Sequence, residues 1–209
     1  LLNNYTGDTM SFDMGQELAE ADGIEVGRVV INDDVAVKDS LYTVGRRGVA
    51  GNFFVMKACG AASEEGKTLE ELVAIGNHVV EVTRTMGMAL TGCTPPAKGS
   101  PIFTLEEDEM EIGIGIHGEP GRKRVKLQPA NKIVDELFEA VQSDLPYKAG
   151  DEVALMINGM GGTPISELYL LYGHAHELAE KMGLKVKRNY VGEYCTSLEM
   201  AGFSLTLVK

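Results

Sequence analysis

One histidine of this sequence stands where its imidazole could reach a ligand. His117 belongs to the segment Gly-Ile-His-Gly-Glu-Pro-Gly (115–121), which follows the apolar run 110–114. The run predicts a strand and the glycines and proline predict a sharp turn, so the histidine falls at a strand end, where binding sites of α/β sheets tend to open. The flanking glycines remove steric cover from the ring, whose charge changes near neutral pH. The alternative is a histidine that only hydrogen-bonds within a tight turn.

A carboxylate near the start of the chain is the second candidate. Asp8 closes the segment Asn-Tyr-Thr-Gly-Asp (4–8), again at a predicted strand end. There it could share a sheet edge with His117 and accept a proton from a substrate hydroxyl. Aspartate also often caps a helix or forms an Asx-turn. The sequence leaves these two interpretations equally open.

Two other motifs have a structural explanation that we favour. The glycine-rich stretch 159–163 stands between a predicted strand and a predicted helix, where backbone N–H groups can bind phosphate. The Lys-Ser or Lys-Thr pair of a phosphate loop does not follow it, so we expect a plain turn. Asp33 and Asp34 could suggest magnesium, but the nearby charges of both signs favour a paired surface loop without a metal.

The remaining histidines and the cysteines predict no site. His174 and His176 stand two residues apart on a predicted helix and point roughly 200° apart, so they cannot converge on one metal ion. His78 lies in the middle of another predicted helix, and we expect a structural role for it. The cysteines are odd in number and widely spaced: Cys59, Cys93 and Cys195. This pattern indicates buried thiols in a reducing cytoplasm, with a nucleophilic thiol as the minor alternative.

These candidates need a scaffold, and the sequence predicts one of alternating strands and helices. β-Branched apolar runs predict strands and amphipathic spacing predicts helices. Strands are expected at 24–31, 88–93, 110–114, 153–158, 184–190 and 203–208, and helices at 12–21, 49–62, 68–86, 130–142 and 164–182. Such alternation predicts an α/β fold with a parallel or mixed sheet.

Local signals set the expected ends of these elements. Thr68 and Glu71 form a capping box that opens the helix expected to reach Met86. Thr163 is expected to cap the helix whose first residue is Pro164. The basic segment 122–126 reads as a turn, and the proline-rich loop 94–101 as a domain boundary or a lid.

Composition sets the outer limits. The 209 residues fit one large domain or two small ones, and 44% hydrophobic with 24% charged residues is typical of a soluble globular protein. No apolar stretch approaches the ~20 residues that span a bilayer, and the first residues lack the pattern of a signal peptide. A net charge of −12 argues against a nucleic-acid partner, although a small anion can still bind locally.

Taken together, the motifs resemble those of the dihydroxyacetone (glycerone) kinases, in their substrate-binding K subunit or K domain. Segment 115–121 resembles the substrate-histidine signature of this family, and segment 4–8 resembles its aspartate motif. Further similar blocks extend the resemblance over the whole chain: 33–42, 45–50, 193–198 and 202–207. The resemblance implies a two-lobed α/β architecture, with the remainder of an N-terminal domain at 1–86 and a C-terminal domain carrying the histidine at 87–209.

The resemblance also implies a chemistry. His117 would bond through a ring nitrogen to the ketone carbon of dihydroxyacetone and form a covalent hemiaminal. Only the neutral imidazole is nucleophilic, and glycerol offers no carbonyl for it to attack. Asp8 would hydrogen-bond a terminal hydroxyl and act as the base in phosphoryl transfer, while Gly7 and Asn3 would belong to the same substrate-binding segment. Other short-chain ketoses or aldoses could share this site.

Partners follow from the same resemblance. The phosphoryl donor would be ATP, or ADP rephosphorylated by a phosphotransferase protein, held with Mg²⁺ on a separate L subunit or domain. The chain itself is expected to bind no cofactor and no metal, to form a homodimer in the cytoplasm, and to contact neither nucleic acid nor membrane.

Two departures from the family pattern keep alternatives open. The family has an earlier Gly-Gly-Gly-Ser-Gly-His-Glu-Pro loop that is not in this chain, so we expect the chain to be the C-terminal two-thirds of a K subunit. Asn3 stands where members often carry a lysine. That change would suit a coactivator that binds dihydroxyacetone and signals to a transcription regulator without passing on phosphate. An inert fragment that keeps the fold is the third alternative.

Overall fold

The structure is a computed structural model that describes residues 1–37 and 45–209; residues 38–42 of the family block 33–42 lie outside the described part. The elements in chain order are β1 (Leu2–Asn3), α1 (Thr6–Ala21), β2 (Val30–Ile31), α2 (Asn52–Glu64), α3 (Leu69–Glu81), β3 (Thr83–Ala89), β4 (Glu109–Ile112), β5 (Lys123–Lys126), α4 (Ala130–Asp144), β6 (Glu152–Gly159), α5 (Ile165–Lys181), β7 (Lys185–Gly192) and β8 (Gly202–Val208).

The main sheet is mixed. Its six strands follow the order β5-β4-β3-β8-β6-β7. β6 and β7 pair in parallel, whereas the other four neighbouring pairs are antiparallel. β1 and β2 form a separate parallel pair of two residues each. The predicted α/β fold with a mixed sheet is therefore confirmed.

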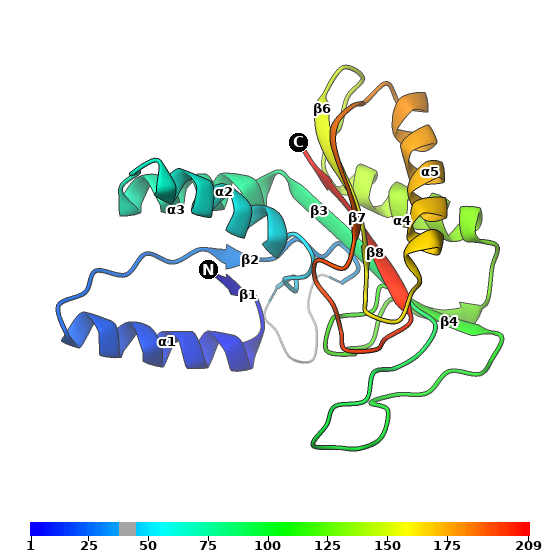
Figure 1. Cartoon of the computed structure of the whole chain (residues 1–209), viewed down its shortest axis with the longest axis horizontal. Helices are drawn as coiled ribbons and strands as arrows, with labels where there is room; N and C mark the ends of the chain where they lie inside the picture. The colour runs from blue at the N-terminus through cyan, green and yellow to red at the C-terminus, as the bar shows by residue number, and fades with distance from the viewer. Residues whose placement is uncertain (38–44) are drawn as a thin grey trace.

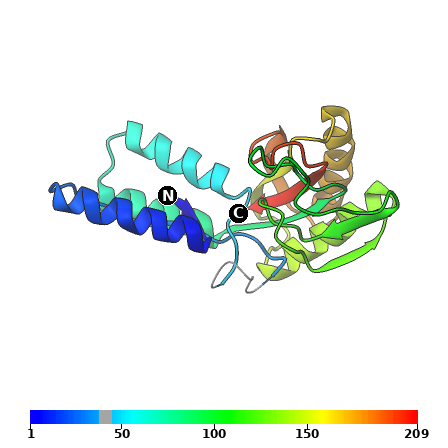
Figure 2. The same ribbon diagram turned by 90° about the horizontal axis from the view of Figure 1, so that it is seen from below.

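The elements gather at two ends of the molecule. Figures 1 and 2 show β1, β2 and α1 to α3 at one end and the six-stranded sheet with α4 and α5 at the other. α4 and α5 pack against each other and against the strands of the sheet. The domain boundary expected at 86/87 falls within β3 and stays a prediction.

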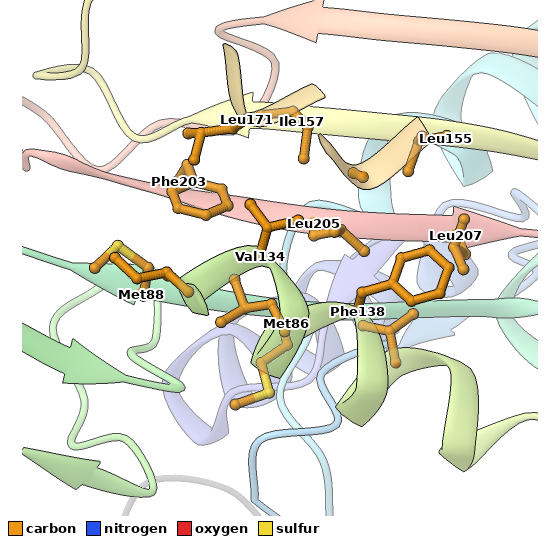
Figure 3. Packing of buried hydrophobic residues seen from close by; sticks show 14 of the residues in the cluster. Met86, Met88, Val134, Phe138, Leu155, Ile157, Leu171, Phe203, Leu205 and Leu207 are labelled. Carbon is orange, nitrogen blue, oxygen red and sulfur yellow. The ribbon is translucent and has the colours of Figure 1, made fainter. Parts of the chain in front are cut away.

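Alternating side chains of the sheet build the main core beneath α4 and α5. Phe203, Leu205 and Leu207 of β8 point from one face of the strand toward these helices (Figure 3). Val134 and Phe138 lie one turn apart on α4 and meet them. This packing fixes the sheet, and with it the end of β4 from which the His117 turn departs.

The helix that begins with the capping box ends earlier than predicted. Thr68 Oγ1 accepts from Glu71 N at 3.3 Å and Glu71 Oε2 accepts from Thr68 N at 2.9 Å, which confirms the box. The helix ends at Glu81, and Met86, its expected last residue, lies in the middle of β3. β3 pairs with β8 along its whole length. The residues from Thr83 to Met86, which the apolar spacing assigned to the helix, are therefore part of a strand.

Three local predictions also differ from the structure. The basic segment 122–126 is not a turn, because Lys123–Lys126 pair with β4 as an edge strand. Thr163 does not cap the following helix; its hydroxyl donates to Gly202 O at 2.8 Å, and Pro164 stands at the N-cap. Within 24–31 the strand comprises Val30–Ile31 alone, since its partner β1 has two residues.

None of the helices in the described part of the chain is long and apolar enough to cross a membrane. The three cysteines are buried and unpaired, as predicted: Cys59, Cys93 and Cys195.

Candidate functional site

A tight turn after β4 carries His117. Gly118 N donates to Gly115 O at 3.0 Å, which closes the turn with Ile116 and His117 at its centre. Gly118 has a φ of +81°, and a Cβ added there would collide with the side chain of Ile102. The glycine after the histidine is therefore required both by backbone conformation and by close packing, which explains the motif.

His117 is exposed and held by Glu119. The His117 side chain is 57% exposed, whereas that of Glu119 is 6% exposed. Nδ1 lies 3.0 Å from Glu119 Oε1, and the backbone N of His117 donates to Oε2 at 3.1 Å. Because a carboxylate only accepts, Nδ1 carries the proton of the neutral ring, and Nε2 keeps its lone pair. The arrangement thus presents a nucleophilic nitrogen away from Glu119.

The same contact controls the protonation of the ring. The hydrogen bond to Glu119 raises the pKa of His117, opposed by burial and helped by the charges of Glu119 and Asp8. Burial raises the pKa of Glu119, but the hydrogen bonds from His117 outweigh it and hold that pKa below its ordinary value. The lowered pKa favours the ionised form of Glu119, and the raised pKa favours the protonated form of His117.

A buried arginine supports the turn from behind. Arg47 is fully buried; its Nε donates to Asp34 Oδ2 at 2.6 Å, its Nη2 to Gly113 O at 2.6 Å, and its Nη1 to Pro120 O at 3.2 Å. These bonds join both ends of the His117 turn to the segment that follows β2. Arg47 therefore fixes the position from which the histidine projects.

The acidic pair is not the surface loop that the sequence predicts. Asp33 and Asp34 are each 1% exposed. Asp33 accepts from Val49 N at 2.9 Å and Gly51 N at 2.7 Å, and Asp34 pairs with Arg47, so donors replace the water lost on burial. Burial raises the pKa of Asp34 to about 6, against the lowering effect of Arg47. Both carboxylates are therefore structural: Asp33 holds the backbone at residues 49–51, and Asp34 holds Arg47, which supports the His117 turn.

The N-terminal segment reaches the histidine through an aromatic ring. The rings of Tyr5 and His117 meet edge to face, with 4.5 Å between their centroids. Asp8 does not lie at a strand end, because α1 begins at Thr6 and places Asp8 in its first turn. The negative charge of Asp8 nevertheless raises the pKa of His117 through electrostatic interaction. The structure therefore brings the two predicted groups into one electrostatic neighbourhood.

Asn3 and Gly7 flank this segment. Asn3 is the last residue of β1, and its buried Oδ1 has no hydrogen-bond partner among the described residues. Gly7 is exposed and has open space where a side chain would stand. Their roles in substrate binding stay predictions.

A pocket opens beside the histidine. It has a volume of about 370 Å³ and is lined by Lys98, Ile102, His117, Gly118, Glu119 and Pro120. A larger hollow of about 490 Å³ lies between α1 and β1, lined by residues such as Leu2, Phe12 and Val26, and does not include His117. The pocket at His117 therefore combines an exposed nucleophile with room for a small ligand.

The other predicted candidates do not join this site. The stretch 159–163 begins with the last residue of β6, and three of its N–H groups are bonded within the protein: Met160 N donates to Gly202 O, Gly161 N to Glu193 Oε2 and Gly162 N to Met200 O. His174 bonds Asp135. The described residues contain no group of three or more metal-ligating side chains that could hold an ion.

Sequence reasoning assigned no role to Glu119, Tyr5 or Arg47. A signal for Glu119 was available, because a carboxylate two residues after a histidine in a turn can reach the ring. The contact of Tyr5 and the burial of Arg47 depend on segments far apart in the chain and left no local signal.

Comparison with known proteins settles the family. A family model described as the Dak1 domain matches residues 1–209. The chain belongs to the Dak1 domain family. Among its Dak1 relatives is the PTS-dependent dihydroxyacetone kinase 1, dihydroxyacetone-binding subunit DhaK of Listeria innocua, 49% identical over 209 residues, which cover 100% of this chain and 64% of that protein. The predicted resemblance to K subunits is confirmed.

Solved Dak1 structures agree with the fold. The dihydroxyacetone kinase operon co-activator Dha-DhaQ superposes with a TM-score of 0.92 at 33% identity, covering 100% of this chain and 64% of that one. The dihydroxyacetone kinase from C. freundii in complex with AMP-PNP and Mg²⁺ gives a TM-score of 0.85 at 28% identity, covering 99% of this chain and 37% of that one. The chain spans about two-thirds of the length of the curated DhaK subunits it matches.

Proposed function

We propose that this chain is the dihydroxyacetone-binding part of a glycerone kinase and that His117 holds the substrate as a covalent hemiaminal. The observation that carries the proposal is the fixed orientation of the ring, with Nδ1 bonded to Glu119 and the His117 side chain at the edge of a pocket. Dihydroxyacetone-binding subunits among the relatives supply the substrate class. A ketone is selected because glycerol has no carbonyl carbon to attack.

The bond-forming step can be written from the groups present. The Nε2 lone pair attacks the ketone carbon, the π pair of the C=O bond moves to the oxygen, and that oxygen takes a proton from solvent. The ring becomes positively charged, and the Glu119 carboxylate 3.0 Å from Nδ1 stabilises that charge. The pocket then contains a tethered triose whose terminal hydroxyls remain free.

Asp8 is proposed as the group that prepares a terminal hydroxyl for phosphoryl transfer, with Gly7 and Asn3 in the same binding segment. Tethering the acceptor supplies positioning, which is the main source of catalysis in this reaction class. The donor is proposed to be ATP, or ADP rephosphorylated through a phosphotransferase system, held with Mg²⁺ by an L subunit or domain. A homodimer in the cytoplasm completes the proposal.

The covalent step is tested by ¹³C NMR of the full-length protein with dihydroxyacetone labelled at C2. We expect the ketone resonance to be replaced by that of a tetrahedral carbon, and His117→Ala to abolish this change. Asp8→Asn is the matched control, because it should keep the tetrahedral signal and slow phosphorylation at least tenfold in the presence of L subunit and donor. A tetrahedral signal that persists in His117→Ala would remove His117 from the mechanism.

A coactivator is the second candidate function. It is favoured by the close superposition with the co-activator Dha-DhaQ and by Asn3 in place of the lysine that the family resemblance implies. Both functions share the hemiaminal, so the NMR experiment does not separate them. Addition of purified L subunit, Mg²⁺ and donor does, because a kinase forms dihydroxyacetone phosphate and a coactivator forms none.

A further inference from the structure

One carboxylate at the end of α4 binds two arginines. Arg46 Nη1 and Nη2 donate to Asp144 Oδ1 at 2.7 Å and Oδ2 at 2.5 Å, and Arg84 Nε donates to Oδ1 at 2.5 Å. Burial raises the pKa of Asp144, but the hydrogen bonds from the two arginines outweigh it and hold that pKa below its ordinary value. The group is therefore a charged, bidentate contact, the geometry in which a carboxylate binds a guanidinium most strongly.

The two arginines connect α4 to the other end of the molecule. Arg46 lies in the segment between β2 and α2. Arg84 lies in β3, and its Nη1 donates to Glu81 O at 2.9 Å, at the end of α3. Since α4 packs against the six-stranded sheet, while β2, α2 and α3 lie at the opposite end (Figures 1 and 2), Asp144 ties the two ends together.

This connection continues to the N-terminal segment of the site. Asn4 Nδ2 donates to the backbone oxygen of Arg46 at 2.7 Å. Asn4 is followed by Tyr5, whose ring meets the imidazole of the site, and then by the first turn of α1 with Asp8. Hydrogen bonds thus lead from Asp144 at the end of α4 to the segment that carries the proposed base.

The next residue of the chain attaches the same segment at a second point. Arg47 Nη2 donates to Gly113 O at 2.6 Å, just before the His117 turn. A segment attached at one point can rotate about it, whereas a second attachment restricts that rotation. The adjacent arginines therefore fix both the place and the orientation of the segment relative to the histidine.

We propose that Asp144 is a positioning residue that holds Asp8 in place relative to the substrate on His117. This inference rests on the proposed function and deepens it, because Asp144 does not line the pocket at His117. Phosphoryl transfer depends on the placement of the acceptor and its base, so a small displacement of Asp8 slows it. Capture of the ketone depends on the local bonds of the His117 turn and is retained.

The test is Asp144→Ala in the full-length protein, assayed with L subunit, Mg²⁺ and donor. We expect kcat for phosphorylation to fall at least tenfold, while KM for dihydroxyacetone and the tetrahedral ¹³C signal of the adduct are retained. The pKa of His117, measured by NMR titration of its ring protons, should fall, because the charge of Asp8 that raises it then acts from farther away. A variant that is only less stable would keep the wild-type pKa in its folded molecules.

The control is Asp151→Ala. The Asp151 side chain is 20% exposed, as is that of Asp144, and it pairs with Lys209 at 2.8 Å. It should change neither kcat nor the pKa of His117. Arg46→Lys is the second variant in case Asp144→Ala does not fold, because lysine keeps the charge but cannot bind both carboxylate oxygens in parallel. It should lower kcat and the pKa of His117 in the same direction.

The outcomes separate this inference from the proposed function. If the wild type forms adduct and phosphate ester, an unchanged kcat or an unchanged pKa of His117 in Asp144→Ala overturns the role of Asp144 and leaves the proposed function intact. Loss of the adduct in folded Asp144→Ala also overturns it. If the wild type forms adduct but no ester, kinase activity fails and the pKa of His117 alone decides on Asp144. If the wild type forms no adduct, both fail.

Discussion

At the scale of single residues, Glu119 has two opposing effects on His117. It fixes the proton on Nδ1 and so frees Nε2, but its charge also raises the pKa of the ring and favours the protonated, non-nucleophilic form. A raised pKa means that the neutral ring becomes populated at higher pH than for an ordinary histidine of pKa 6.5. Adduct formation should therefore increase as pH rises through the raised pKa of His117.

Replacing the carboxylate separates the two effects. Glu119→Gln keeps the shape and one acceptor but removes the charge, so the pKa of His117 should fall and the pH midpoint of adduct formation should move down with it. Titration of the histidine ring protons by NMR measures the first quantity, and the C2 resonance of bound dihydroxyacetone measures the second. An unchanged midpoint for His117 would show that Glu119 does not set its protonation.

At the scale of elements, the sequence could predict what depends on neighbours in the chain. The capping box at Thr68 and the turn at His117 follow from spacing within a few residues, and the structure contains both. The end of α3 could not be predicted, because the residues shortly after Glu81 form β3, which pairs with β8 more than a hundred positions away in the chain. The burial of Asp34 could not be predicted either. The two residues before it in the sequence are polar, and its charge is compensated by Arg47, thirteen positions away.

The ion pair of Arg47 and Asp34 connects the segment after β2 to the His117 turn, so its loss should lower the free energy of unfolding. Arg47→Met leaves a buried carboxylate without its partner and frees the carbonyls of the His117 turn, so we expect a loss of about 3–5 kcal/mol in the free energy of unfolding, measured with urea. The double variant Arg47→Met with Asp34→Asn should lose less than the sum of the single variants. Lys67→Ala, which breaks an exposed pair with Glu71, should cost under about 1 kcal/mol. Equal losses in Arg47→Met and Lys67→Ala would contradict the role of the buried pair.

At the scale of the whole molecule, the main core and the candidate site occupy different regions. The core lies between the sheet and α4 and α5, while His117 projects from a turn that contacts the N-terminal segment through Tyr5. The apolar alternation of β8 could be predicted from sequence, but the contact with Tyr5 could not, since it depends on how the two ends of the molecule meet (Figure 2). Stability and ligand capture should therefore respond to different substitutions.

Leu205→Ala tests this separation. Leu205 is fully buried at the centre of β8, so truncation should leave a cavity and lower the free energy of unfolding by about 2–5 kcal/mol. At a temperature where the variant remains folded, the tetrahedral ¹³C signal of bound dihydroxyacetone should be as strong as in the wild type. Leu205 belongs to the main core cluster, whereas Ile114 and Ile116, which lead into the His117 turn, belong to two other clusters. Leu170→Ala, at an exposed position of α5, should change neither quantity. If Leu205→Ala lost the adduct while its circular dichroism stayed native, the placement of His117 would depend on the packing of the whole sheet rather than on the local bonds of Glu119 and Arg47.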